Sequence, residues 1–148
     1  METNFTRSLS THIKYIRDDI LKIINGLYNR ALNHDNSKWS DAERPYYEKT
    51  EHIETKNLNS YKEVLEATYN IVAPALDNHM KLNRHHPEHH KNGINDMNLI
   101  DIIEMVCDWH SSAKTRQLPL DIKYNVDRFN ISPQLEKIIK NTVKLLDD

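Results

Sequence analysis

Apolar residues recur at three- and four-residue steps along most of this chain, the spacing that gives a helix one buried face. With only two glycines and five prolines, the chain lacks the closely spaced turn residues of an all-β protein. Its 148 residues are enough for one domain with a core of its own. The pattern predicts an all-α fold, a single-domain bundle of about five to seven helices over residues 1–148.

The first apolar stripe is interrupted by Asn25-Gly26. Glycine lowers helix stability and often follows a helix end, so we expect a break there and a second, short helix over residues 27–34. A break would let His12 and His34 approach one another from two directions.

Two sequences of the form Ser-x-x-Glu, at residues 40–43 and 60–63, predict capping boxes that open the next two helices. Residues 50–59 between them are polar and predict a mobile surface loop. The second of these helices reaches Pro74, where it must kink or restart because proline has no backbone N–H.

Two helices are predicted after the histidine-rich segment 84–90. The first is capped by Asn95 or Asp96 and runs to about Lys114. The last begins at Ser132 as N-cap, because the proline that follows suits the first helical position.

Charge, cysteine content and hydropathy exclude several classes of protein. The net charge is −2 with both signs interspersed, and no run of Lys or Arg indicates binding to duplex nucleic acid. The single cysteine, Cys107, rules out an intrachain disulfide. The N-terminus lacks the apolar core of a signal peptide, and no apolar run is long enough to span a membrane. We expect a soluble cytoplasmic protein and leave a homo-oligomer open.

Nine histidines make histidine the outlier of the composition. The adjacent pair His34-Asp35 can bind one metal ion from a helix end, and Lys38 is placed to meet an anion bound to that metal. One such pair is a weak signal by itself. Further histidines before and after it, and a late ladder of three carboxylates, strengthen it; these residues are His12, His79, His85, His86, Asp101, Glu104 and Asp108.

Asp35 and Asp108 each follow an apolar helical stretch that must be buried. Two buried carboxylates at close range are costly unless a cation neutralises them. Neighbouring imidazoles make a divalent metal the natural counter-charge. We therefore expect the metal ligands to converge, and they are His12, His34, Asp35, His79, His86 and Asp108.

This order of residues resembles the HD-domain superfamily of metal-dependent phosphohydrolases, which are all-helical. His34-Asp-Asn-Ser-Lys38 is similar to the superfamily's His-Asp-x-x-Lys form, and Cys107-Asp108-Trp109 is similar to its late helical Asp. More closely, residues 11–116 resemble an uncharacterised phage and bacterial family known only as a domain of unknown function. The shared motifs are His34-Asp-x-Ser-Lys38, Asn83-x-His-His-Pro-Glu-His89 and Glu104-Met-x-x-Asp-Trp109.

The resemblance implies an HD-domain-like fold and hydrolysis of a nucleotide or related small phosphate ester by a metal-activated water. In that reading His12, His34, Asp35 and Asp108 hold the first ion. His79, His85 or His86 binds a second ion or acts as general acid.

Imidazole and carboxylate ligands suit Mn, Fe, Co, Ni or Zn, as one or two ions. Lys38, Arg84 and Arg116 are the candidates to neutralise the phosphate, Lys38 beside the metal and the arginines by their forked guanidinium groups. Two alternatives stay open: a di-iron oxygenase on an HD fold, and a non-catalytic metal-binding or interaction protein.

Overall fold

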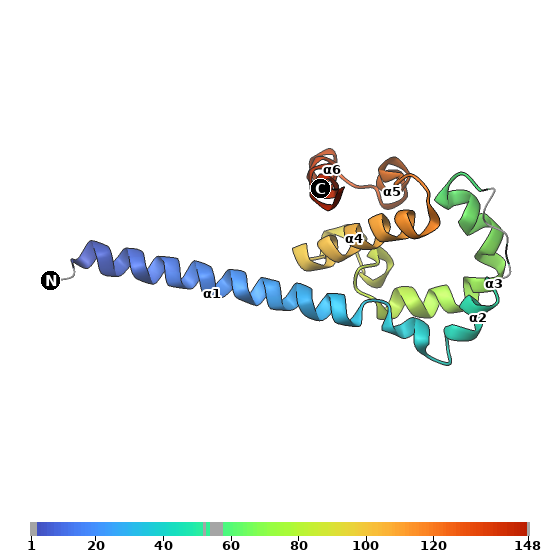
Figure 1. The fold of residues 1–148 in the computed structure, drawn as a ribbon, viewed down its shortest axis with the longest axis horizontal. Coiled ribbons are helices and arrows are strands. Elements are labelled where there is room, and N and C mark those ends of the chain that lie inside the picture. The colour runs from blue at the N-terminus through green and yellow to red at the C-terminus, as the bar shows by residue number, and fades with distance from the viewer. Residues whose placement is uncertain (1–2, 52, 54–57, 148) are drawn as a thin grey trace. The chain divides into compact units, whose positions relative to one another are not determined.

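The computed structural model describes residues 3–51, 53 and 58–147. Within them the chain forms six α-helices and three short 3-10 helices, and no described residue lies in a strand (Figure 1). The α-helices are α1 Asn4–Asn33, α2 Arg44–Glu48, α3 Tyr61–Leu82, α4 Leu99–Arg116, α5 Ile122–Phe129 and α6 Pro133–Asp147. The 3-10 helices are η1 Asn36–Trp39, η2 Pro87–His89 and η3 Gly93–Asp96. The predicted all-α class is confirmed.

No helix in the described part of the chain is both long and apolar enough to cross a membrane. The surface loop predicted over residues 50–59 includes 52 and 54–57, which lie outside the described residues.

The chain forms two compact units, Met1–His34 and Asp35–Asp148. The first consists of α1, an uninterrupted helix of 30 residues that Thr3 caps by accepting a hydrogen bond from the Thr6 amide. The break predicted at Asn25-Gly26 is wrong. One glycine costs a helix only about 1 kcal/mol, and the good helix formers around it outweigh that cost. A single helix cannot form a hydrophobic core, so this first unit is not a domain of its own by that criterion. The prediction that residues 1–148 form one domain stays a prediction.

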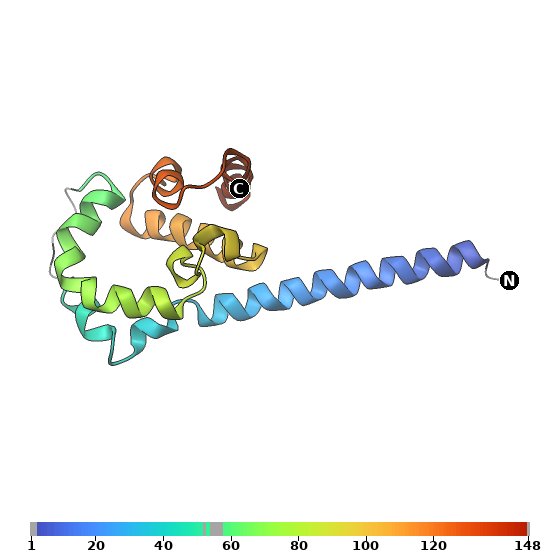
Figure 2. The same ribbon diagram turned by 180° about the vertical axis from the view of Figure 1, so that it is seen from behind.

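In the second unit, α3 continues through Pro74 as one helix and changes direction along its length (Figures 1 and 2). Proline removes one backbone hydrogen bond and its ring crowds the preceding turn, so the helix bends rather than ends. The predicted capping Ser60 is confirmed, since its side chain accepts from the Glu63 amide at 3.3 Å.

The start of α4 lies later than predicted. Its N-cap is Asn98, whose side chain accepts from the Asp101 amide at 3.0 Å, while the Asp101 carboxylate accepts from the Asn98 amide at 3.1 Å. This reciprocal box takes the place of a cap at Asn95 or Asp96, which belong to η3.

The core of the second unit lies where α5 and α6 pack on α4, an arrangement that both views show (Figures 1 and 2). Its buried members are Met105 and Val106 of α4, Ile139 of α6, and Ile131 just before α6. Burying a side chain of this kind contributes roughly 1.5–3 kcal/mol. This core fixes α4, which carries three of the carboxylates described next.

Candidate metal centre

Asp35 begins the second unit in the left-handed backbone conformation, with φ of 57°. Its carbonyl accepts the Lys38 amide at 2.9 Å to start η1, and its carboxylate forms an ion pair with the Lys38 ammonium group. Asn83, at the end of α3, donates to the Ser37 hydroxyl at 2.7 Å. These contacts fix η1 against α3 and hold the Asp35 carboxylate in place.

His79 of α3 and His85, just beyond that helix, both face the same oxygen of Asp35. The distance from Asp35 Oδ1 to Nε2 is 3.2 Å for His79 and 3.5 Å for His85. Both imidazoles are buried, with 3% and 2% of the residue exposed. Two imidazole nitrogens and a carboxylate oxygen therefore meet at one buried point.

The far nitrogen of His79 is held by Glu43, which is fully buried. His79 Nδ1 donates to Glu43 Oε2 at 2.9 Å, and the side-chain amide of Asn78 donates to Glu43 Oε1 at 2.8 Å. A proton on Nδ1 leaves the lone pair of Nε2 aimed toward Asp35. A carboxylate behind a histidine is the usual support of a metal-binding imidazole.

His85 has the same support from a different helix. Its Nδ1 lies 3.3 Å from Oε1 of Glu104, a nearly buried carboxylate on α4. Each of these two histidines therefore carries a carboxylate on the nitrogen that points away from Asp35. This repeated arrangement orients both Nε2 atoms toward the Asp35 carboxylate.

His86 is the third imidazole, with its ring centre 4.2 Å from that of His85 and 4.8 Å from that of His79. Burial, with a smaller contribution from the neighbouring His85 and His79, lowers the pKa of His86 to about 3. The ring is therefore neutral at pH 7. Its Nε2 is buried without a hydrogen-bond partner among the described residues, which costs roughly 1–3 kcal/mol. A cation at this nitrogen would remove that cost.

The spacing of the four groups fits a metal ion. One ligand atom from each of Asp35, His79, His85 and His86 lies within 4.8 Å of the others. Ligands at about 2.1 Å from a shared ion are themselves roughly 3–4 Å apart, so small side-chain shifts suffice. Three imidazoles with one carboxylate are a donor set for Mn, Fe, Co, Ni or Zn. These residues fit the group that the sequence predicts.

Asp108 of α4 adjoins this cluster. One of its carboxylate oxygens lies within 4.8 Å of a His85 nitrogen, and its charge opposes the lowering of the His86 pKa. Its place makes it a candidate ligand for the same ion or for a second one.

His12 does not join His34. Both belong to the first unit, where His12 is exposed within α1 and His34 is the C-cap residue. They are 22 residues apart on one continuous helix, a rise of roughly 33 Å. The prediction that both bind one ion within a single chain is therefore wrong, because the expected helix break is absent. A role for His34 beside Asp35 stays a prediction.

Arg84 is engaged with a carboxylate, and its binding of a phosphate group stays a prediction. Its guanidinium forms a fork with the fully buried Asp101 carboxylate, at 2.9 Å from Nη2 and 3.2 Å from Nε. This pair raises the pKa of Arg84 and links the chain after α3 to the first turn of α4. The fork also positions His85, the next residue.

Sequence reasoning missed the supporting role of two glutamates. Glu43 was assigned to a capping box with Ser40, but no side-chain cap precedes α2 and the Glu43 carboxylate bonds α3 instead. No local sequence pattern predicts the contact of Glu43 with α3. Glu104 was placed in the acidic ladder, and its presence in the motif Glu104-Met-x-x-Asp-Trp109 was the available signal.

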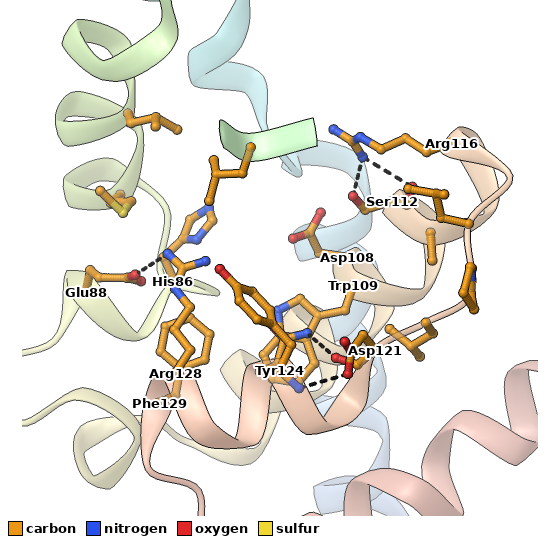
Figure 3. Close-up of a pocket in the computed structure, with 18 of the residues that line it drawn as sticks. His86, Glu88, Asp108, Trp109, Ser112, Arg116, Asp121, Tyr124, Arg128 and Phe129 are labelled. Atoms are coloured by element: carbon orange, nitrogen blue, oxygen red, sulfur yellow. Dashed lines mark hydrogen bonds and ion pairs between the residues drawn. The ribbon is translucent and has the colours of Figure 1, made fainter. Parts of the chain in front are cut away.

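A cavity of about 290 Å³ adjoins the cluster, and His86 and Asp108 belong to its lining. Figure 3 shows these two residues on the wall of the cavity, with Trp109 and Tyr124 beside them. Arg116, the third predicted phosphate-binding residue, also lines it and donates to the Ser112 carbonyl at 3.2 Å and to the Ser112 hydroxyl. The cluster is therefore open to a ligand on one side.

Fold and cluster together define an all-helical protein with a buried centre of histidines and carboxylates. The chain belongs to a family of unknown function, DUF5662, whose sequence profile matches residues 1–145. The comparisons with curated proteins and with solved structures gave no match.

Proposed function

We propose that this protein is a metal-dependent hydrolase of a small phosphate ester. The observation that carries the proposal is the His86 nitrogen, buried and without a partner in the described part of the chain, beside two carboxylate-supported histidines and Asp35. The cavity at His86 and Asp108 gives a substrate access to this point. This supports a reacting centre over a purely structural site, which has no need of an open side.

In this proposal, different residues bind the ion, orient its ligands and neutralise the phosphate. Asp35, His79, His85 and His86 would hold a divalent ion, with Asp108 beside them. Such an ion supplies an activated water near neutral pH, because it lowers the pKa of water from about 15.7 toward ~7. Glu43 and Glu104 keep two imidazoles oriented. Lys38, paired with Asp35, adds a positive charge close to where phosphate oxygens would lie.

Metal analysis with a phosphate-release assay tests the proposal. Purified protein should contain a transition metal in stoichiometric amount and release phosphate from a general aryl phosphate. Asp35→Asn and Asp108→Asn should each lose metal and activity. Asp127→Asn is the control, because that carboxylate pairs with Lys123 on the exposed face of α5.

Two results would overturn the proposal. Protein without metal after expression in metal-supplemented medium would remove its basis. Iron-loaded protein that consumes oxygen and releases no phosphate would point to an oxygenase on the same ligands.

A further inference from the structure

The cavity beside the cluster has mostly apolar and aromatic walls. Leu76 and Met80 line it from α3, Trp109 from α4 and Phe129 from α5, with Leu120 from the chain between α4 and α5. The Trp109 and Phe129 rings are stacked, with centres 6.0 Å apart and planes within 3°. The consecutive helices α4 and α5 thus place two stacked aromatic rings in the lining of the cavity that His86 also lines (Figure 3).

The charges around the cavity do not suit a polyanion. Among the described residues its lining holds two arginines, three carboxylates and no lysine; the charged residues are Arg116, Arg128, Glu88, Asp108 and Asp121. Arg128 is engaged with Glu88 at 2.7 Å, and Asp121 accepts the Tyr124 amide as N-cap of α5. A chain of phosphates would meet more negative than positive charge here, apart from any bound ion.

The cavity volume sets the size of the occupant. At about 290 Å³ it lies at the lower end of the range for small-molecule pockets, roughly 300–1,000 Å³. A group of one or two rings, or a short branched hydrocarbon, fills such a space.

We infer that the substrate is a monoester whose organic part is an apolar, ring-sized group lying between Trp109 and the α3 side chains, with its single anionic head at the cluster. The inference rests on the proposed function and narrows it, since it excludes nucleoside polyphosphates as the preferred substrates. Contact with the apolar wall provides most of the binding affinity for the monoester, and the cluster positions its anionic head group.

Binding measurements on the metal-loaded protein test the inference. The probes are naphthyl phosphate in the form of its non-hydrolysable methylenephosphonate analogue, inorganic phosphate and ATP, each titrated by calorimetry. Naphthyl phosphate should bind at least about tenfold more tightly than phosphate, because only the ester reaches the apolar wall. ATP should bind no more tightly than phosphate.

Ala113→Phe fills the cavity from α4, and Ser111→Phe introduces the same side chain on the same helix away from it. Ala113→Phe should reduce the naphthyl phosphate affinity to that of phosphate while metal content and phosphate affinity stay unchanged. Ser111→Phe should leave all three as in the parent. Ala113→Leu adds less volume and keeps the test usable if the phenylalanine variant fails to fold.

An unchanged naphthyl phosphate affinity in both Ala113 variants would overturn the inference, as would ATP binding more tightly than the naphthyl ester. Binding of 1-naphthol to metal-free protein, lost in Ala113→Phe, separates the two proposals. If naphthol binds in this way while the metal-loaded protein releases no phosphate, the apolar subsite stands and the hydrolase fails. If phosphate is released but naphthol does not bind, the reverse holds.

Discussion

The segment Arg84–His90 contains two adjacent histidine pairs with opposite surroundings. His85 and His86 face carboxylates and one another in the interior. His89 and His90 instead lie at backbone carbonyls, with Nδ1 of His89 2.7 Å from the Lys81 oxygen and Nε2 of His90 2.9 Å from the Arg84 oxygen. The rings of both pairs are close to one another, so ring contact does not distinguish them. The two pairs differ in their surroundings: both inner rings lie in the cluster around Asp35, and His85 also has a carboxylate at its second nitrogen.

The largest expected difference between the two pairs is in metal content. His85→Ala removes a proposed ligand that Glu104 orients, so bound metal should fall from stoichiometric to less than about one tenth. His89→Ala removes only a contact with a backbone carbonyl and should retain the full amount. Elemental analysis of both purified variants makes the comparison. Equal metal in the two would show that the inner pair is not a ligand pair.

Weakening the support behind the inner histidines should have a smaller effect. Glu43→Gln and Glu104→Gln keep the shape of the side chain but lose its charge, and each should lower metal affinity about 10- to 100-fold. Competition with a chromogenic chelator measures this. Glu136→Gln, in an exposed pair with Lys140, is the matched control. If all three variants bind alike, the carboxylates do not tune the imidazoles.

The pKa of His86 differs between the folded and the unfolded chain, and this difference predicts how the stability of the metal-free protein depends on pH. Burial, the main cause, and the charges of His85 and His79 lower its pKa to about 3 in the folded protein from 6.5. Between these values the unfolded chain binds the proton and the folded chain does not, so the free energy of unfolding falls as the pH drops from 6.5 toward 3.

Denaturant unfolding in the presence of a chelator measures this dependence. His86→Leu should show a shallower fall over the same window, because it lacks the titrating group. A slope identical to that of the parent protein would mean that His86 is not buried as neutral imidazole.

The outer pair should contribute least. His90→Ala loses one hydrogen bond to the Arg84 carbonyl and should lower the free energy of unfolding by about 0.5–1.5 kcal/mol, with no change in metal binding. Thermal unfolding of chelated protein checks the first part, and elemental analysis checks the second. A loss of metal in this variant would contradict the prediction that only the inner of the two pairs, His85 and His86, takes part in metal binding.

Local pattern predicted the helices well where the deciding interactions are local. Ser132 caps α6 as expected, with its hydroxyl accepting from the Leu135 amide at 3.3 Å. The same reasoning failed at Gly26, where helix propensity is a weak preference that the rest of a long helix overrides. It failed again at Glu43, whose partners on α3 are 35 and 36 residues away.

The centre itself was predictable in kind but not in detail. Histidines and carboxylates in excess, near apolar stretches, pointed to a metal. Which histidine turns inward depends on contacts across α3 and α4 that no short window contains, as Glu43 and Glu104 illustrate. The ion pair between Arg84 and Asp101 could not be predicted from local sequence either, since the two residues lie 17 positions apart.

The left-handed backbone at Asp35 restricts which amino acids can replace it. Glycine and asparagine adopt this conformation at little cost, whereas branched or bulky side chains strain it. Aspartate also adopts it, but glycine and asparagine supply no carboxylate. In a library of all substitutions at this position, selection for folded protein would keep glycine, asparagine and aspartate, and selection for bound metal would keep aspartate alone. The gap between the two outcomes would measure how far the requirements of folding and of chemistry differ at one residue.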